Sequence, residues 1–197
     1  MTGKPLKKVV FLVTGNVNKF NEACLVLDEF GLSTAMLNVE TTEIQDDNVE
    51  NVAQTSAIDA VEKCNLPIIV EDAGLFIDAL NGFPGPYSSY VFRTIGLKGI
   101  LKLMKDINKR SATFNAVVAF HSPEFKSPKC FHGCVKGKIT KQMRGSKGFG
   151  YDPLFLPNLN KGETFAEMSA PEKNQHSHRA KALRAFAEWY VSKFLDI

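Results

Sequence analysis

The feature that most constrains the fold is an apolar run near the start of the chain that ends in a glycine turn and leads into a helical pattern. Residues 9–13 read Val-Val-Phe-Leu-Val, which is typical of a strand buried on both faces. Thr14-Gly15-Asn16 ends the run, and apolar residues then recur at helical spacing from Phe20 to Phe30, before a capping Gly31. A buried strand followed by a helix predicts an α/β protein.

The next segments repeat this alternation. We expect residues 34–39 to form a second strand, and the apolar positions between Val52 and Cys64 mark a second helix that stops before Pro67. Residues 68–70 read Ile-Ile-Val and predict another short buried strand, with Glu71 and Asp72 at its end.

The middle of the chain has a different character. Residues 81–87 form a turn-rich loop, because prolines fix φ and glycines permit conformations that other residues avoid. A helix is expected at residues 98–107. The alternating patterns of residues 112–120 and 131–139 predict two strands that pair antiparallel.

The last helix is expected to begin at a capping box. Ser169 and Glu172 have the Ser-x-x-Glu spacing, and apolar residues from Leu183 to Phe194 give the helix a stripe. We find no repeat and no linker, so residues 1–197 are expected to form one domain around a single mixed β-sheet flanked by helices. Helix-bearing ends and a strand-rich middle predict two lobes with a cleft between them.

Composition excludes several classes of protein. With 44% hydrophobic residues the chain can bury a full core, and a net charge of +3 does not demand a nucleic-acid partner. The first apolar run is too short for a signal peptide or a membrane span, so we expect a cytoplasmic protein without a membrane partner. The cysteines lack the paired spacing of a zinc site; they are Cys24, Cys64, Cys130 and Cys134.

The loop between the first strand and the first helix is a candidate anion site. Free backbone N–H groups and the helix dipole favour a phosphate there, and Lys19 adds a full positive charge. The candidate residues are Thr14, Gly15, Asn16, Val17, Asn18 and Lys19. A glycine turn after a strand is also common in proteins without a phosphate.

Two carboxylates are candidate metal ligands. Glu43 and Asp72 follow strands that we expect to be neighbours, which would bring both to one edge of the sheet. Two carboxylates together with substrate phosphates are a usual way to hold Mg²⁺. Glu71 points to the opposite face, and we interpret it, with Asp46 and Asp47, as a solvated acid.

A glycine-rich segment and a basic segment near the end of the chain predict a pocket for a purine base. In Gly148-Phe149-Gly150-Tyr151-Asp152-Pro153, Phe149 offers a stacking surface and Asp152 an acceptor. Lys173, His178 and Arg179 offer donors that suit a carbonyl at C6 and oppose the amino group of adenine. Each segment alone is equally compatible with an ordinary turn or a basic helix.

Together these segments resemble the inosine triphosphate pyrophosphatase family, also called Ham1-like. The resemblance spans nearly the whole chain and rests on five pieces in order: Thr14-Gly15-Asn16 with Lys19; Val70-Glu71-Asp72 with Gly74-Leu75; Phe83-Pro84-Gly85-Pro86-Tyr87-Ser88; residues 148–153; and Ala166-Glu167-Met168 through Lys173-Asn174 to Ser177-His178-Arg179. It implies an elongated mixed sheet, a homodimer, and hydrolysis of ITP, dITP and XTP to the monophosphate and pyrophosphate with Mg²⁺, or Mn²⁺ in its place.

The resemblance also implies roles for residues. Those that would bind substrate are Thr14, Gly15, Asn16, Val17, Asn18, Lys19, Ala73, Phe149, Gly150, Tyr151, Asp152, Lys173, His178 and Arg179. Asp72 and Lys19 would be catalytic, with Asp72 as the base, and Glu43 and Asp72 would engage the metal. The chain departs from the family pattern at Thr55 and Ser89, where basic residues are expected; Arg93, Lys98 and Lys147 are candidates to replace them.

Two other functions fit parts of the sequence. A pyrophosphatase acting on another modified nucleotide would share every feature above and differ only in a substrate panel. A module that binds single-stranded nucleic acid would explain the basic pI, but it would not require Glu43 and Asp72 beside a phosphate loop.

Overall fold

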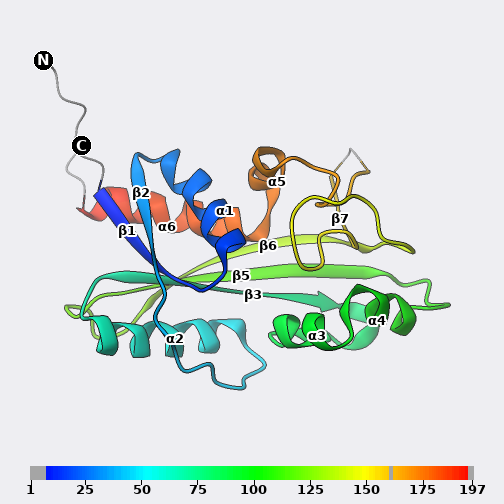
Figure 1. Cartoon of the computed structure of the whole chain (residues 1–197), viewed down its shortest axis with the longest axis horizontal. Helices are drawn as coiled ribbons and strands as arrows, with labels where there is room; N and C mark the ends of the chain where they lie inside the picture. Colours follow the sequence, from blue (N-terminus) through cyan, green and yellow to red (C-terminus); the bar gives the residue numbers. More distant parts are fainter. Residues whose placement is uncertain (1–7, 160–161, 195–197) are drawn as a thin grey trace, which may run out of the picture.

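A computed structural model describes residues 8–159 and 162–194; the first seven and last three residues of the predicted domain lie outside this part. Figure 1 shows an elongated molecule in which β3, β5 and β6 run along the long axis. Its helices and strands are β1 (Lys8–Val13), α1 (Val17–Asp28), β2 (Leu32–Leu37), α2 (Val49–Cys64), β3 (Ile68–Ile77), η1 (Asp78–Leu80), β4 (Pro84–Gly85), α3 (Ser88–Thr94), α4 (Gly96–Leu103), β5 (Ser111–His121), β6 (Lys129–Ile139), β7 (Phe155–Pro157), α5 (Ala170–His176) and α6 (His178–Phe194).

The strands form one mixed sheet, as predicted. Its order is β2-β1-β3-β5-β6-β7, with β4 paired to β3. β1 is parallel to β2 and to β3, whereas β3, β5, β6 and β7 pair antiparallel in turn. The expectation that Glu43 and Asp72 follow neighbouring strands is wrong, because β1 lies between β2 and β3.

β3 is longer than the sequence predicted. Its apolar run stops at Val70, but pairing with β5 continues through Ile77, with Asp72 opposite Val117. Asp72 therefore lies within the strand and not at its end. The antiparallel partner supplies backbone hydrogen bonds to residues 71–74, which read Glu-Asp-Ala-Gly and do not by themselves predict a strand.

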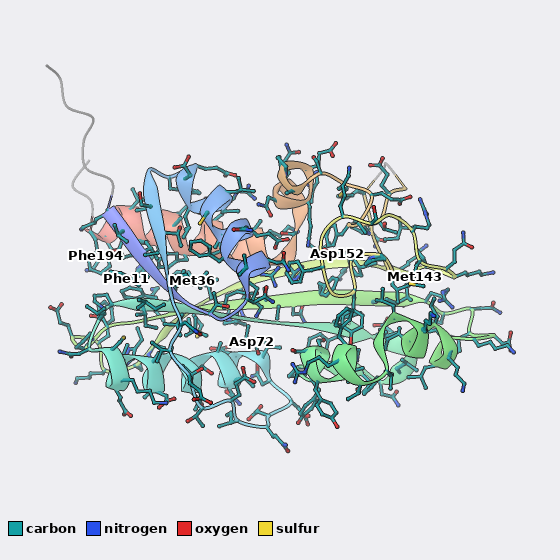
Figure 2. The ribbon with its side chains drawn as sticks, in the orientation of Figure 1. Phe11, Met36, Asp72, Met143, Asp152 and Phe194 are labelled. Carbon is teal, nitrogen blue, oxygen red and sulfur yellow. The ribbon has the colours of Figure 1, made fainter. Side chains whose placement is uncertain are left out.

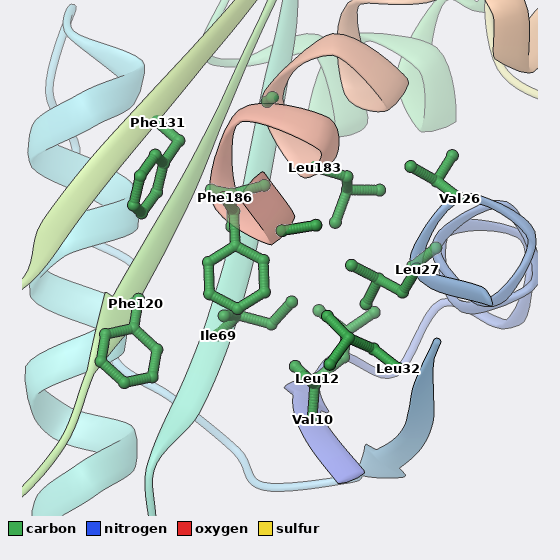
Figure 3. Packing of buried hydrophobic residues seen from close by; sticks show 14 of the residues in the cluster. Val10, Leu12, Val26, Leu27, Leu32, Ile69, Phe120, Phe131, Leu183 and Phe186 are labelled. Carbon is green, nitrogen blue, oxygen red and sulfur yellow. The ribbon is translucent and has the colours of Figure 1, made fainter. Parts of the chain in front are cut away.

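Helices cover both faces of the sheet. α1 and α6 pack on one face around Leu12, Ile69 and Phe120, and Figure 3 shows Leu183 and Phe186 of α6 in this core. α2 covers the other face, where its alanines contact residues such as Ile68, Val70 and Val117. Since side chains alternate along a strand, Glu71 shares the face of Ile69, and Asp72 shares the face of Val70.

Three helical details differ from the predictions. α3 was missed, because it is short and follows directly on a loop rich in proline and glycine. The predicted helix at residues 98–107 is α4, which ends at Leu103. The capping box of Ser169 and Glu172 is confirmed, but the helix that it begins is α5, which ends where Ser177 adopts an extended backbone before α6.

Within residues 8–159 and 162–194, no helix is both long and apolar enough to cross a membrane. The two lobes and the intervening cleft stay predictions.

Candidate active site

The loop before α1 is fixed by its own side chains. Asn16 caps the helix, and its Oδ1 accepts hydrogen bonds from the backbone N–H groups of Asn18 at 2.9 Å and Lys19 at 3.3 Å. The Thr14 hydroxyl accepts from the Asn16 N–H at 3.1 Å. Three N–H groups that the sequence left free for an anion are therefore already bonded within the loop, while Val17 is exposed beside them.

The Lys19 side chain extends from this loop to β3. Its Nζ donates to the backbone oxygen of Glu71 at 3.0 Å and forms an ion pair with Glu71 Oε2 at 3.0 Å. Lys19 keeps 22% of its side chain exposed, so the charge still faces solvent. The candidate phosphate loop is thus joined to the strand that carries Asp72.

Glu71 is not the solvated acid that we expected. It is buried, and its Oε1 lies 3.0 Å from Nε of Arg179 in α6, in addition to its ion pair with Lys19. Burial opposes ionisation, but Arg179 and then Lys19 outweigh it and hold the pKa of Glu71 below its usual range. The prediction failed because a short apolar run followed by an acid resembles a strand end.

Asp72 lies next to this ion pair on the opposite face of β3. Burial raises its pKa to about 6; Lys19 opposes the rise, and the carboxylates of Glu71 and Glu43 add to it. Glu43 is exposed in the coil between β2 and α2, close enough to act on Asp72 electrostatically. Across the described ranges, no three His, Cys, Asp or Glu residues form a group that could hold a metal ion by itself.

The predicted base segment is held in place by Asp152. Its Oδ2 accepts from the Phe149 N–H at 2.9 Å and pairs with Nζ of Lys173. Gly148 has a φ of +71°, and a Cβ there would collide with Asp152 Oδ2. A glycine is therefore required for the carboxylate to reach its partners.

The ring of Phe149 lies against the two predicted donors that carry full charges. Lys173 Nζ is 4.7 Å and Arg179 Cζ is 5.2 Å from the ring centroid. Both side chains are buried. The structure thus brings Phe149, Asp152, Lys173 and Arg179 together from segments that are far apart in the sequence.

His178 is also in this cluster, but it is buried against aromatic rings. It stacks on Phe114 with centroids 4.3 Å apart and an interplanar angle of 6°. Burial, with Arg179 and Lys173 nearby, lowers its pKa well below the usual value, so the imidazole is neutral at pH 7. Tyr151 faces the core instead, where its hydroxyl donates to the backbone oxygen of Ser88 at 2.9 Å.

Sequence reasoning missed Glu22. This buried carboxylate of α1 pairs with Lys173 at 2.8 Å and with Arg179 at 2.6 Å. Burial would raise its pKa, yet the two cations lower it. A signal was available, because Glu22 lies four residues before Val26 and so on the apolar stripe of the helix.

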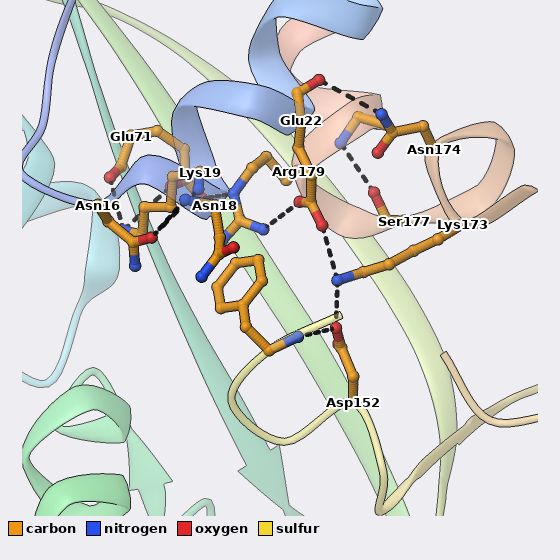
Figure 4. Close-up of polar contacts among 12 residues, drawn as sticks. Asn16, Asn18, Lys19, Glu22, Glu71, Asp152, Lys173, Asn174, Ser177 and Arg179 are labelled. Carbon is orange, nitrogen blue, oxygen red and sulfur yellow. Dashed lines mark hydrogen bonds and ion pairs between the residues drawn. The ribbon is translucent and has the colours of Figure 1, made fainter. Parts of the chain in front are cut away.

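These residues form one continuous chain of alternating charges. Figure 4 shows it running from the base segment to the loop before α1, in the order Asp152, Lys173, Glu22, Arg179, Glu71 and Lys19. In Figure 2, Asp72 and Asp152 both lie near the middle of the long axis. Most of the buried side-chain polar atoms in residues 8–159 and 162–194 that lack a hydrogen-bond partner belong to this region, on Glu71, Asn174, His178 and Arg179. The atoms of Glu71 and Arg179 are paired by charge instead, with each other and with Lys19.

The two departures from the family pattern lie on helices. Thr55 is half-buried in α2, and Ser89 is exposed at the start of α3. Arg93 Nη1 donates to the Ser89 hydroxyl at 2.7 Å, which places a guanidinium beside that position. Lys147 instead donates to the backbone oxygen of Glu167 at 3.2 Å.

Comparison with known proteins agrees with this architecture. A model of the Ham1 family matches residues 10–189, so the chain belongs to the Ham1 family. It is 47% identical to the dITP/XTP pyrophosphatase of Methanopyrus kandleri over 183 residues, which cover 93% of this chain and 96% of that protein.

Solved structures of Ham1 proteins have the same fold. The HAM1 protein of Coxiella burnetii is 28% identical with a TM-score of 0.82, over 94% of this chain and 99% of that one. The Ham1 protein of Staphylococcus aureus is 26% identical with a TM-score of 0.81, over 94% of this chain and 100% of that one.

Proposed function

We propose that this protein hydrolyses the non-canonical purine nucleotides ITP, dITP and XTP to the nucleoside monophosphate and pyrophosphate. The observation that carries the proposal is the chain of charges, which links the Phe149 base segment to the loop of Lys19 and, beside it, to Asp72. The relative from Methanopyrus kandleri, which aligns over nearly the full length, is named for dITP and XTP.

Selectivity against adenine follows from the donors. Lys173 and Arg179 suit a carbonyl at C6, whereas the amino group of adenine would leave each of them facing another donor. Both cations keep their carboxylate partners with either base, so the penalty for ATP comes from the remaining N–H groups that adenine would leave unpaired, at about 1–3 kcal/mol for each buried group. GTP shares the C6 carbonyl, and its rejection would depend on the 2-amino group.

We propose Mg²⁺ as the cofactor, with Mn²⁺ able to replace it, held by Asp72 and Glu43 together with substrate phosphates. The residues fit a cation, because burial and the charges of Glu71 and Glu43 raise the pKa of Asp72, and a positive ion would relieve that repulsion. When bound, the ion would neutralise charge on the phosphates.

In the proposed reaction, Asp72 acts as general base. It accepts a proton from a water whose oxygen attacks a phosphorus of the α–β anhydride, while the bond to the leaving oxygen breaks. Lys19 stabilises the negative charge that develops on the pyrophosphate. Asp72 has a raised pKa, as is common for a general base that works near neutral pH.

The deciding experiment is a substrate panel. Pyrophosphate release is measured from ITP, dITP, XTP, GTP and ATP, with Mg²⁺ and with EDTA. We expect ITP, dITP and XTP to be hydrolysed far faster than GTP and ATP, and only with the metal. Comparable kcat/KM for ATP would refute the base pocket, whereas salt-dependent binding of single strands without turnover would support a nucleic-acid module.

We further propose that the protein is a homodimer. Exposed apolar side chains gather in and beside α3, on Phe83, Tyr87, Tyr90, Phe92 and Ile95. An exposed patch of this kind is typical of a contact surface. Light scattering coupled to gel filtration should give twice the chain mass of 21.8 kDa; a monomer at micromolar concentration would contradict the proposal.

A further inference from the structure

Glu71 links Arg179, which lies against the ring of Phe149, to Lys19 of the candidate phosphate loop. Its carboxylate lies between Nε of Arg179 and Nζ of Lys19, each at 3.0 Å, and its backbone oxygen accepts a second contact from the same Lys19 amine. The three residues come from β3, α6 and α1. The Glu71 carboxylate of β3 therefore connects α6, which carries a residue of the base pocket, to α1, which carries a residue of the candidate phosphate site.

Lys19 and Arg179 each depend on Glu71 in a different way. Arg179 has a second carboxylate partner, because its Nη1 pairs with Glu22. Within residues 8–159 and 162–194, the hydrogen bonds and ion pairs of the Lys19 side chain are with Glu71 alone. A change of the Glu71 side chain would therefore leave Lys19 with only its hydrogen bond to the Glu71 backbone oxygen, and it would leave Arg179 paired only with Glu22.

The Glu71 carboxylate is buried between two cations. Each of its oxygens contacts a cationic nitrogen at 3.0 Å, Oε1 on Arg179 and Oε2 on Lys19. A buried carboxylate between two cations responds when one of them moves, because a low local dielectric makes each remaining charge count more. If Lys19 moved toward a phosphate, its repulsion of Arg179 would fall, and Glu71 would hold Arg179 more tightly.

We propose that Glu71 is a positioning residue that couples recognition of the base by Arg179 to recognition of the phosphates by Lys19. This inference rests on the proposed function, and it assigns Glu71 no contact with the substrate. Its specific consequence is that Lys19, in the phosphate loop, influences selectivity for the base through Glu71.

The ratio of kcat/KM for ITP to that for ATP isolates this effect. The two substrates carry the same triphosphate, so the loss of a phosphate contact alone lowers both values equally and leaves the ratio unchanged. We expect Lys19→Met and Glu71→Gln each to lower the ratio by at least about fivefold. The double variant should lower it no further than Glu71→Gln alone, because the path of coupling is then already lost.

Matched variants separate positioning from damage to the fold. Lys63→Met removes a surface lysine that pairs with Asp59, and it should leave the ratio unchanged. Glu71→Asp keeps the charge and should recover part of the ratio lost in Glu71→Gln. Circular dichroism checks that each variant is folded. Where turnover is too slow to rank substrates, calorimetry measures the Kd for inosine and for adenosine, and the ratio of these two constants replaces the ratio of kcat/KM.

The outcomes are distinct. A ratio that stays at the wild-type value in Lys19→Met and Glu71→Gln, while both kcat/KM values fall together, would overturn the coupling. Additive losses in the double variant would also overturn it. Failure of the proposed function would appear differently, as a wild-type protein that releases no pyrophosphate from ITP and binds inosine no better than adenosine.

Discussion

At the scale of single residues, the burial of Asp72 conflicts with its proposed role as a base. It is buried enough for its pKa to rise to about 6, and it must be ionised to act as a base. At pH 8 without a divalent metal, the folded protein therefore carries an unfavourable charge. Asp72→Asn should abolish most turnover and, with EDTA present, stabilise the fold at pH 8 by up to about 3 kcal/mol.

The size of this stabilisation depends on pH in a defined way. Below the unfolded pKa of about 4 for an aspartate, the carboxyl is neutral in both states, and the variant gains nothing. The gain should grow as pH rises from 4 to 6 and then level off. Urea unfolding at several pH values measures it, with the exposed Asp106→Asn as the control. A gain that is equal at pH 4 and pH 8 would show that charge is not its cause.

The sequence predicted several residues that the structure brings together, but it did not predict the two carboxylates that pair with them. Lys19, Asp72, Phe149 and Lys173 stand in short motifs whose chemistry is local, so their residue types suffice. Glu22 and Glu71 acquire their roles only when α6 packs against α1 and β3 and brings Arg179 to them. A carboxylate gives no local sign that a cation from another segment will bury it.

At the scale of elements, the base segment depends on the backbone of Gly148. Gly148 and Gly150 both have positive φ, but only at Gly148 would a Cβ strike the Asp152 carboxylate. We expect Gly150→Ala to cost about 1 kcal/mol of stability from backbone strain alone. Gly148→Ala should cost about 1–3 kcal/mol more, because it also displaces Asp152 from the Phe149 N–H and Lys173.

Chemical denaturation of the two variants tests this prediction directly. Since a Cβ at Gly150 would meet only open space, the Gly150→Ala variant controls for the cost of positive φ. Equal losses in both variants would mean that Asp152 relaxes freely. A larger loss in Gly148→Ala should be accompanied by weaker discrimination between ITP and ATP, because Phe149 and Lys173 lose a shared anchor.

Elements with a strong periodic pattern were predicted well, and those that depend on partners were not. β1, α1, α2, β5 and β6 have clear patterns of apolar residues, and each was found within a few residues of its predicted place. The second half of β3 exists because β5 pairs with it. The break between α5 and α6 falls at Ser177, whose side chain accepts a hydrogen bond from the Ala180 N–H and so caps α6. This second cap was not predicted, because the capping box at Ser169 was assigned to a single last helix.

At the scale of the whole molecule, the site is built from segments that are far apart in the sequence, and the charged chain connects them. It joins α1, β3, α5, α6 and the base segment, and the same helices α1 and α6 also build the core around Leu183 and Phe186. A ligand that binds the folded site should therefore stabilise the core as well as the site. This follows if residues 1–197 are one cooperative unit, as the sequence predicts.

Trp189 reports on that question, because it is the only tryptophan and packs in α6 against Phe120 and Phe131, each with a centroid distance of 5.3 Å. Inosine 5′-monophosphate at about 100 times its Kd contributes about 2.7 kcal/mol, which raises Tm by about 5–10 °C for a domain of this size. We expect Trp189 fluorescence and far-ultraviolet circular dichroism to show the same increase. If the ligand shifted only the circular dichroism transition and left the Trp189 transition in place, the molecule would unfold as two units, and the single domain would be wrong.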